Sequence, residues 1–131
     1  MATFVDTSGI LTLLNRSEGN HAAASTIWEA LVDAGGALTT SSFVLVETYA
    51  LLQRRFGLEA VQTFHEEILP LLDVHWIDDA TFTSAATALL AAGRRQLSLV
   101  DCVSFVLMRR LGIDAAFAWD RHFEEQGFHL A

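Results

Sequence analysis

The spacing of apolar positions along the chain switches repeatedly between two periods. Short apolar runs bounded by turn residues predict strands, and longer stretches with apolar residues three or four apart predict helices. The expected strands are 2–5, 37–40, 71–76, 115–119 and, at the edge of the sheet, 128–130. The expected helices are 10–14, 21–34, 43–56, 58–68, 80–92, 98–111 and 121–126.

Strands that alternate with helices in this way predict an α/β fold. A central parallel sheet of four or five strands should be covered by helices on both faces. If the 131 residues were split into two domains, each domain would have too small a core. We therefore expect a single domain over residues 1–131.

The composition adds an expectation about partners. Hydrophobic residues make up 52% of the chain, with three Trp and nine Phe, which is at or above the high end for a soluble monomer. Either the core is tightly packed, or apolar side chains such as Trp28, Trp76 and those around Phe64 contact a second copy or another protein. We favour a homodimer or a complex.

The sequence also gives an expected location and an expected role for its one cysteine. No apolar run approaches the roughly 18 residues that span a bilayer, and the N-terminus has neither the basic flank nor the cleavage site of a signal peptide. We expect a cytoplasmic protein without membrane contact. The one cysteine, Cys102, is expected to be a small core residue.

The charge balance limits how the chain can bind nucleic acid. Sixteen acidic residues face eight arginines and no lysine, a net charge of −8. Because basic surfaces supply most non-specific affinity for nucleic acid, this balance argues against a general nucleic-acid binder. Chemistry on phosphate would need metal ions and local arginines.

Four carboxylates occupy suggestive positions. Asp6 follows the first expected strand and Asp120 follows the fourth, and ligands of open α/β sheets bind at the carboxyl ends of the strands. Glu47 lies on the helix after the second strand, among apolar residues, where an unpaired charge is costly. Asp101 lies in the first turn of the helix that starts at Ser98.

Each of the four also has an ordinary structural explanation. Asp6, or Ser8 beside it, can cap the following helix, as can Asp120. Ser98 and Asp101 have the spacing of a capping box, and Glu47 can reach solvent or pair with an arginine. Taken together, however, clustered carboxylates repel one another and make sense mainly as a site for a hard divalent cation. Oxygen ligands favour Mg²⁺ or Mn²⁺ over zinc.

Four segments in this order resemble the PIN-domain nucleases, in particular the VapC-type toxins of bacterial toxin–antitoxin pairs. They are Phe4–Ser8, Val46–Glu47, Leu97–Cys102 and Ala118–Phe123. The resemblance spans the whole chain in order and length. Trp119 and Cys102 stand where smaller or other residues are common, a departure that bears on pocket shape and leaves the ligand set intact.

The resemblance implies a three-layer α/β/α sandwich and a Mg²⁺- or Mn²⁺-dependent endoribonuclease. The family's acidic positions fall on Asp6, Glu47, Asp101 and Asp120, and its small hydroxyl positions fall on Thr7, Ser8 and Ser98. It also implies a cognate antitoxin that covers a hydrophobic groove and pushes a basic side chain into the carboxylate pocket. RNA, rather than DNA, as the substrate rests on this resemblance alone.

In such a site we expect Asp6, Asp101 and Asp120 to hold the principal cation, while Glu47 orients water or completes a second site. Thr7 or Ser8 would hydrogen-bond a carboxylate or the scissile phosphate. Two rival interpretations remain: a non-catalytic α/β interaction domain whose acids only cap helices, and a metal-dependent DNA nuclease or phosphatase.

Side chains that could assist are few. We expect Arg16 and Arg121 to lie near the crevice as phosphate clamps, and the arginine pairs to complement helix ends. Of the five histidines, only His122, two residues after Asp120, has a position that suggests a function.

Overall fold

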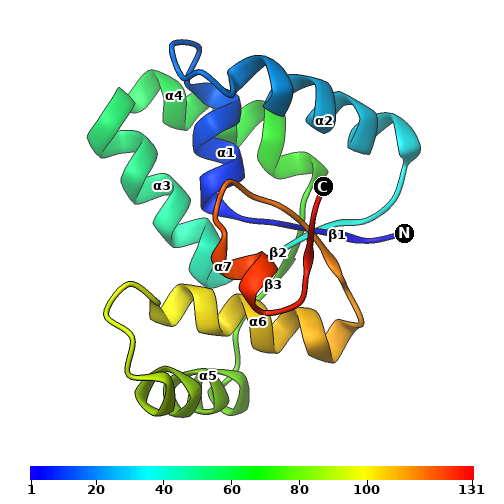
Figure 1. Ribbon diagram of the computed structural model, residues 1–131. Coiled ribbons are helices and arrows are strands. Elements are labelled where there is room, and N and C mark those ends of the chain that lie inside the picture. Colours follow the sequence, from blue (N-terminus) through cyan, green and yellow to red (C-terminus); the bar gives the residue numbers. More distant parts are fainter.

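The computed structural model describes residues 1–131 and contains one five-stranded sheet (Figure 1). All strand pairs are parallel, in the order β3-β2-β1-β4-β5. The strands are β1 (Thr3–Val5), β2 (Leu38–Ser41), β3 (Asp73–His75), β4 (Ala115–Phe117) and β5 (His129–Leu130). The expected parallel sheet is confirmed, and it has five strands rather than four.

Helices connect successive strands. They are α1 (Thr7–Leu14), α2 (His21–Ala34), α3 (Ser42–Phe56), α4 (Leu58–Thr63), α5 (Asp79–Ala92), α6 (Leu99–Leu111) and α7 (His122–Glu125). Figure 1 shows α1 to α4 on one side of the sheet and α5 and α6 on the other. No helix is both long enough and apolar enough to cross a membrane.

Two apolar cores lie on the two faces of the sheet and establish three layers. Neighbouring strand residues point to opposite faces, so Phe4 joins the core under α5 and α6 while Val5 joins the core under α1 and α2. Ala116 and Phe117 divide between the two cores in the same way. Cys102 is 4% exposed in the first core, as expected.

Several boundaries differ from the expected ones for identifiable reasons. The helix expected over 58–68 is regular only to Thr63, after which a π-helix (Phe64–Ile68) and a 3₁₀ turn (Leu69–Leu71) precede β3. Pro70 favours this ending because it cannot donate a helical hydrogen bond. Strand β4 ends at Phe117 because the Trp119 N–H turns away to Ser8.

Only some of the apolar residues expected to contact a partner lie at the surface. Trp28 is 8% exposed and Phe64 is 1% exposed, so both belong to the core and were wrongly placed at an interface. Trp76, directly after β3, is 77% exposed, and Val46 on α3 is 66% exposed. Of the residues expected at a partner surface, Trp76 is therefore exposed as predicted, whereas Val46 was not among them.

Candidate metal centre

Asp6 lies at the carboxyl end of β1, between β2 and β4, where the order of strands reverses. Its backbone N–H donates to the carbonyl of Phe117 on β4 at 3.1 Å. The side chain caps α1, because Oδ2 accepts from the Ser8 N–H at 3.1 Å and from Ser8 Oγ at 2.5 Å. Such a reversal point is where ligands bind in open α/β sheets.

Ser8 connects Asp6 to the segment after β4. Its Oγ accepts a hydrogen bond from the Trp119 N–H at 2.9 Å while it donates to Asp6. The expectation that Thr7 or Ser8 contacts a carboxylate is met by this bond. Ser8 thereby fixes the Asp6 carboxylate relative to the chain that carries Asp120.

Asp101 comes from the first turn of α6, held by the capping box that the sequence suggested. The Ser98 N–H donates to Asp101 Oδ2 at 3.1 Å, and the Asp101 N–H donates to Ser98 Oγ at 3.0 Å. The residue is 9% exposed. Ser98 therefore orients Asp101, and the helix start fixes where this carboxylate points.

Asp120 and His122 complete the cluster from the loop after β4. Asp120 Oδ1 accepts from the His122 N–H at 2.9 Å. His122 Nδ1 lies 3.0 Å from Asp120 Oδ1 and 3.7 Å from Asp101 Oδ2, and its side chain is 14% exposed. Nδ1 is buried without a hydrogen bond of good geometry. Ligand atoms of Asp101, Asp120 and His122 lie within 4.8 Å of one another.

His122 is the residue that sequence reasoning undervalued. Its only signal was its position two residues after Asp120, and no histidine spacing typical of metal sites marked it. In the structure the imidazole touches two of the four expected carboxylates. It therefore belongs in the description of the site.

Capping and ligand roles turn out to be compatible in the three aspartates. Asp6 and Asp101 each use Oδ2 for the helix start, and Asp120 uses Oδ1. The other oxygen of each carboxylate makes no hydrogen bond within the chain. Because a carboxylate has two acceptor oxygens, the caps leave one oxygen of each aspartate for a cation.

Glu47 and Thr7 approach the cluster from α3 and α1. Glu47 is half-buried and its neighbour Val46 is 66% exposed, so this part of α3 is not turned fully inward as expected. Glu47 instead borders a shallow apolar hollow with Phe43 and Val100. The Thr7 hydroxyl bonds the Val44 carbonyl at 3.3 Å and Thr48 Oγ1 at 2.9 Å, which ties α1 to α3.

The electrostatics of the cluster favour a cation. Burial raises the pKa of Asp6 to about 7, with repulsion from Asp101 and Asp120 adding to it and the Ser8 bonds opposing it. Burial also raises the pKa of Asp101 and of Glu47, and Asp120 repels both. The donor set of carboxylate oxygens and one imidazole nitrogen fits a divalent cation, which would relieve this repulsion.

The metal-free protein should therefore lose stability as the pH rises. Asp6 has a pKa of about 7 in the folded chain and 3.8 as its reference, so the folded state holds the proton more tightly. Its stabilising contribution is complete below pH 4 and is lost as the pH passes through 7. We expect the melting temperature in chelator to fall between pH 5 and pH 8, and Mn²⁺ to reverse part of the fall. A flat profile would contradict the raised pKa values.

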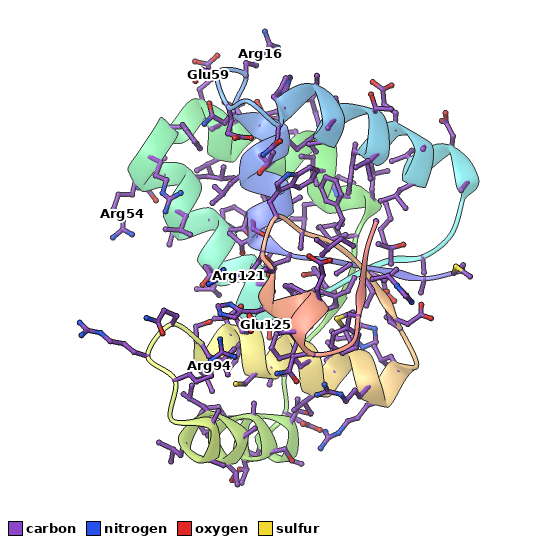
Figure 2. The ribbon with its side chains drawn as sticks, in the orientation of Figure 1. Arg16, Arg54, Glu59, Arg94, Arg121 and Glu125 are labelled. Atoms are coloured by element: carbon purple, nitrogen blue, oxygen red, sulfur yellow. The ribbon has the colours of Figure 1, made fainter.

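The arginines divide into structural and free groups (Figure 2). Arg94 pairs with Glu125 at 3.2 Å, Arg109 donates to Gln126, and Arg110 donates to Thr81 at 2.6 Å. Arg121 is exposed next to Asp120, as expected. Arg16, however, lies near Glu59 beyond the far end of α1, so its expected place near the carboxylates is wrong.

Comparison with known proteins gives consistent matches over nearly the whole chain. A family model described as PIN domain matches residues 3–128. The "23S rRNA-specific endonuclease VapC20" of Mycobacterium tuberculosis is 33% identical over 126 residues, covering 95% of this chain and 94% of that protein.

Solved structures give the same picture. The crystal structure of M. tuberculosis VapC20, described as a sarcin–ricin loop cleaving toxin, superposes with a TM-score of 0.82 at 33% identity, covering 98% of this chain and 96% of that one. FitAcB from Neisseria gonorrhoeae matches with a TM-score of 0.71 at 13% identity, covering 99% of this chain and 96% of that one. VapBC2 from Rickettsia felis, bound to a fragment of promoter DNA, matches with a TM-score of 0.70 at 14% identity, covering 100% of this chain and 98% of that one. The last two matches concern the fold alone.

Proposed function

Because this chain belongs to the PIN domain family, we propose that it is a metal-dependent endoribonuclease that hydrolyses RNA phosphodiester bonds as one domain, residues 1–131. The observation that carries the proposal is the convergence of Asp101, Asp120 and His122 within 4.8 Å, beside Asp6 at the reversal point of the sheet. Acids that only capped helices would not need to meet there, and their mutual repulsion would be unexplained.

In the proposed site Asp6, Asp101 and Asp120 would hold Mg²⁺ or Mn²⁺ through the oxygens that the caps leave free. Glu47 would orient water or complete a second site. A bound divalent cation supplies an activated water near neutral pH and neutralises charge on the phosphoryl oxygens. Carboxylate oxygens suit both ions.

The chain's own residues would prepare this chemistry by position. Ser8 orients Asp6, and Ser98 orients Asp101. Thr7 holds α1 against α3 next to Glu47. Arg121, exposed beside Asp120, has no ion-pair partner and is the proposed clamp for a substrate phosphate.

RNA is the proposed substrate because the 33%-identical VapC20 is named as a 23S rRNA endonuclease. A sarcin–ricin loop oligonucleotide is therefore the first probe. We expect cleavage with Mn²⁺ or Mg²⁺, none in EDTA, and none of the DNA of matched sequence or of a small phosphomonoester. Asp33→Asn, on the exposed surface of α2, is the control variant and should cut like the wild type.

Other outcomes of this assay would overturn the proposal in different ways. Cleavage of the DNA or of the phosphomonoester in preference to RNA would indicate a DNA nuclease or phosphatase. No cleavage of any substrate together with no Mn²⁺ uptake would indicate a non-catalytic interaction domain.

We also propose a cytoplasmic location, a cognate antitoxin and a homodimer. A hollow of about 680 Å³ between α1, α2 and α4 combines apolar Leu13 and Phe56 with Glu59 and Glu67, which suits an amphipathic basic segment of an antitoxin. The exposed Val46 and Trp76 are candidates for the dimer surface. The mass in solution, measured with and without a co-expressed small neighbouring protein, tests both; a lone monomer in each case would contradict them.

A further inference from the structure

We propose that a second hollow, which extends along α1 from Ser8, binds one unpaired nucleobase of the RNA, with the indole of Trp119 as its stacking surface. The inference rests on the proposed nuclease function and adds to it a site for recognising the substrate. It concerns residues outside the set of acids and hydroxyls described above, apart from one shared wall, Ser8.

The hollow has the size and the mixed lining of a small-ligand site. Its volume is about 370 Å³, within the range of roughly 300–1,000 Å³ for such sites. It lies between α1, the loop that follows it, the end of α3 and the segment after β4. The lining residues that matter here are Ser8, Asn15, Glu18, Arg55, Phe56 and Trp119.

One hydrogen-bond chain ties this hollow to the proposed metal ligands. The Trp119 N–H donates to Ser8 Oγ at 2.9 Å, and Ser8 Oγ donates to Asp6. Trp119 is also bonded covalently to Asp120. A base held here would therefore belong to a nucleotide close to the scissile phosphate.

The indole is held in place yet remains accessible. Its ring packs edge-on against the buried ring of Phe117, with centroids 5.8 Å apart at an interplanar angle of 84°. The residue is half-buried, and it lines the hollow together with Phe56. A half-buried ring that lines a hollow can serve as a platform for stacking, which contributes strongly for single-stranded bases.

Glu18, in the wall of the hollow, favours a base over a phosphate as the occupant of that part of the hollow. Glu18, whose Oε2 accepts from the Asn20 N–H at 2.9 Å, lines the wall. Its carboxylate would repel a phosphate but can accept hydrogen bonds from the N–H groups on the edge of a base. Arg55 is exposed, forms no salt bridge and lies where it can pair with the phosphate of the bound nucleotide.

The test is a coupling measurement between Trp119 and individual bases. Wild-type, Trp119→Phe and Trp119→Ala proteins are compared on a series of sarcin–ricin loop RNAs, each with one abasic position. Binding is measured with Asp6→Asn present in all three, so that this readout does not require cutting, and cleavage is measured without it. Unfolding curves check that each variant is folded.

We expect Trp119→Ala to weaken the binding of intact RNA about 5- to 150-fold, the range that corresponds to loss of one stacked base. Trp119→Phe should weaken this binding much less. For the RNA that is abasic at one particular position, binding by the wild type should already be weak, and Trp119→Ala should not weaken it further. Arg55→Gln should weaken binding to every RNA, whereas Arg54→Gln, whose side chain points away in Figure 2, should not.

An equal effect of Trp119→Ala at every abasic position would overturn the inference, as would loss of antitoxin binding with RNA binding unchanged. Failure of the nuclease proposal looks different: the wild type would cut no RNA, whatever the binding cycle shows. Coupling at one position without cleavage would retain the base site and reject the nuclease.

Discussion

Replacing Asp6 by asparagine is expected to lower kcat/KM for RNA by roughly 1,000-fold or more, because a cation that supplies several kcal/mol of transition-state stabilisation loses a charged ligand. The change is nearly isosteric. Asparagine is also a good cap, since its amide oxygen can accept the Ser8 N–H as Asp6 Oδ2 does at 3.1 Å. The loss should therefore appear in cleavage and in Mn²⁺ affinity without a loss of fold.

The same substitution should stabilise the metal-free protein. A buried carboxylate with a pKa of about 7 against a reference of 3.8 costs stability above neutral pH, by an upper limit on the order of 4 kcal/mol at about 1.4 kcal/mol per pKa unit. In EDTA at pH 8, Asp6→Asn should melt at a higher temperature than the wild type, and the control Asp33→Asn should melt at the same temperature as the wild type. An active Asp6→Asn protein, or one that melts lower, would contradict this account.

Replacing Gly9 by alanine should destabilise the fold and reduce cleavage together. A Cβ atom on Gly9 would lie 2.4 Å from the Phe117 carbonyl oxygen and 2.6 Å from its ring carbon Cδ2. One of these groups must move, so α1, which follows Asp6, must separate from β4, which precedes Asp120. Overpacking of this kind costs about 1–3 kcal/mol or more, partly offset by the better helix propensity of alanine.

Gly19→Ala provides a matched control, because a Cβ there would meet nothing within 4 Å. The measurements are the midpoint of denaturant unfolding and kcat/KM on the same RNA. We expect a lower midpoint and weaker cleavage for Gly9→Ala only. Equal midpoints for the two variants would show that the close approach of α1 to β4 is not needed.

The fold was predictable because its signals are local. Strands β1 and β4 are short, mostly apolar runs, and four of the helices start at a capping residue, such as Ser41 before α3 and Asp78 before α5. Parallel strands then bring their carboxyl ends to one edge, which is why Asp6 and Asp120 could be expected to meet. The four segments that resemble the family point the same way.

What the sequence could not decide depends on directions in space. Arg16 looked close to Asp6 in the chain, but the helix between them has 8 residues, which span about 12 Å at 1.5 Å per residue. Trp28 and Phe64 are as apolar as surface residues such as Trp76, and composition does not tell a core from an interface. The hollow at Trp119 needs α1, α3 and β4 together, so no local pattern reveals it.

The choice between cap and ligand was posed as an alternative, and the geometry removes the conflict. Ser98 holds one oxygen of Asp101 at 3.1 Å and leaves the other free, so a single carboxylate can end a helix and face a cation. Helix capping therefore supplies the rigid first support of the proposed ligands.

The most direct test of the central claim is anomalous diffraction from crystals soaked with Mn²⁺. We predict a peak in contact with carboxylate oxygens of Asp6, Asp101 and Asp120, and its loss in Asp6→Asn crystals treated in the same way. No peak at these residues, or an unchanged peak in the variant, would contradict the claim that these carboxylates form a metal centre.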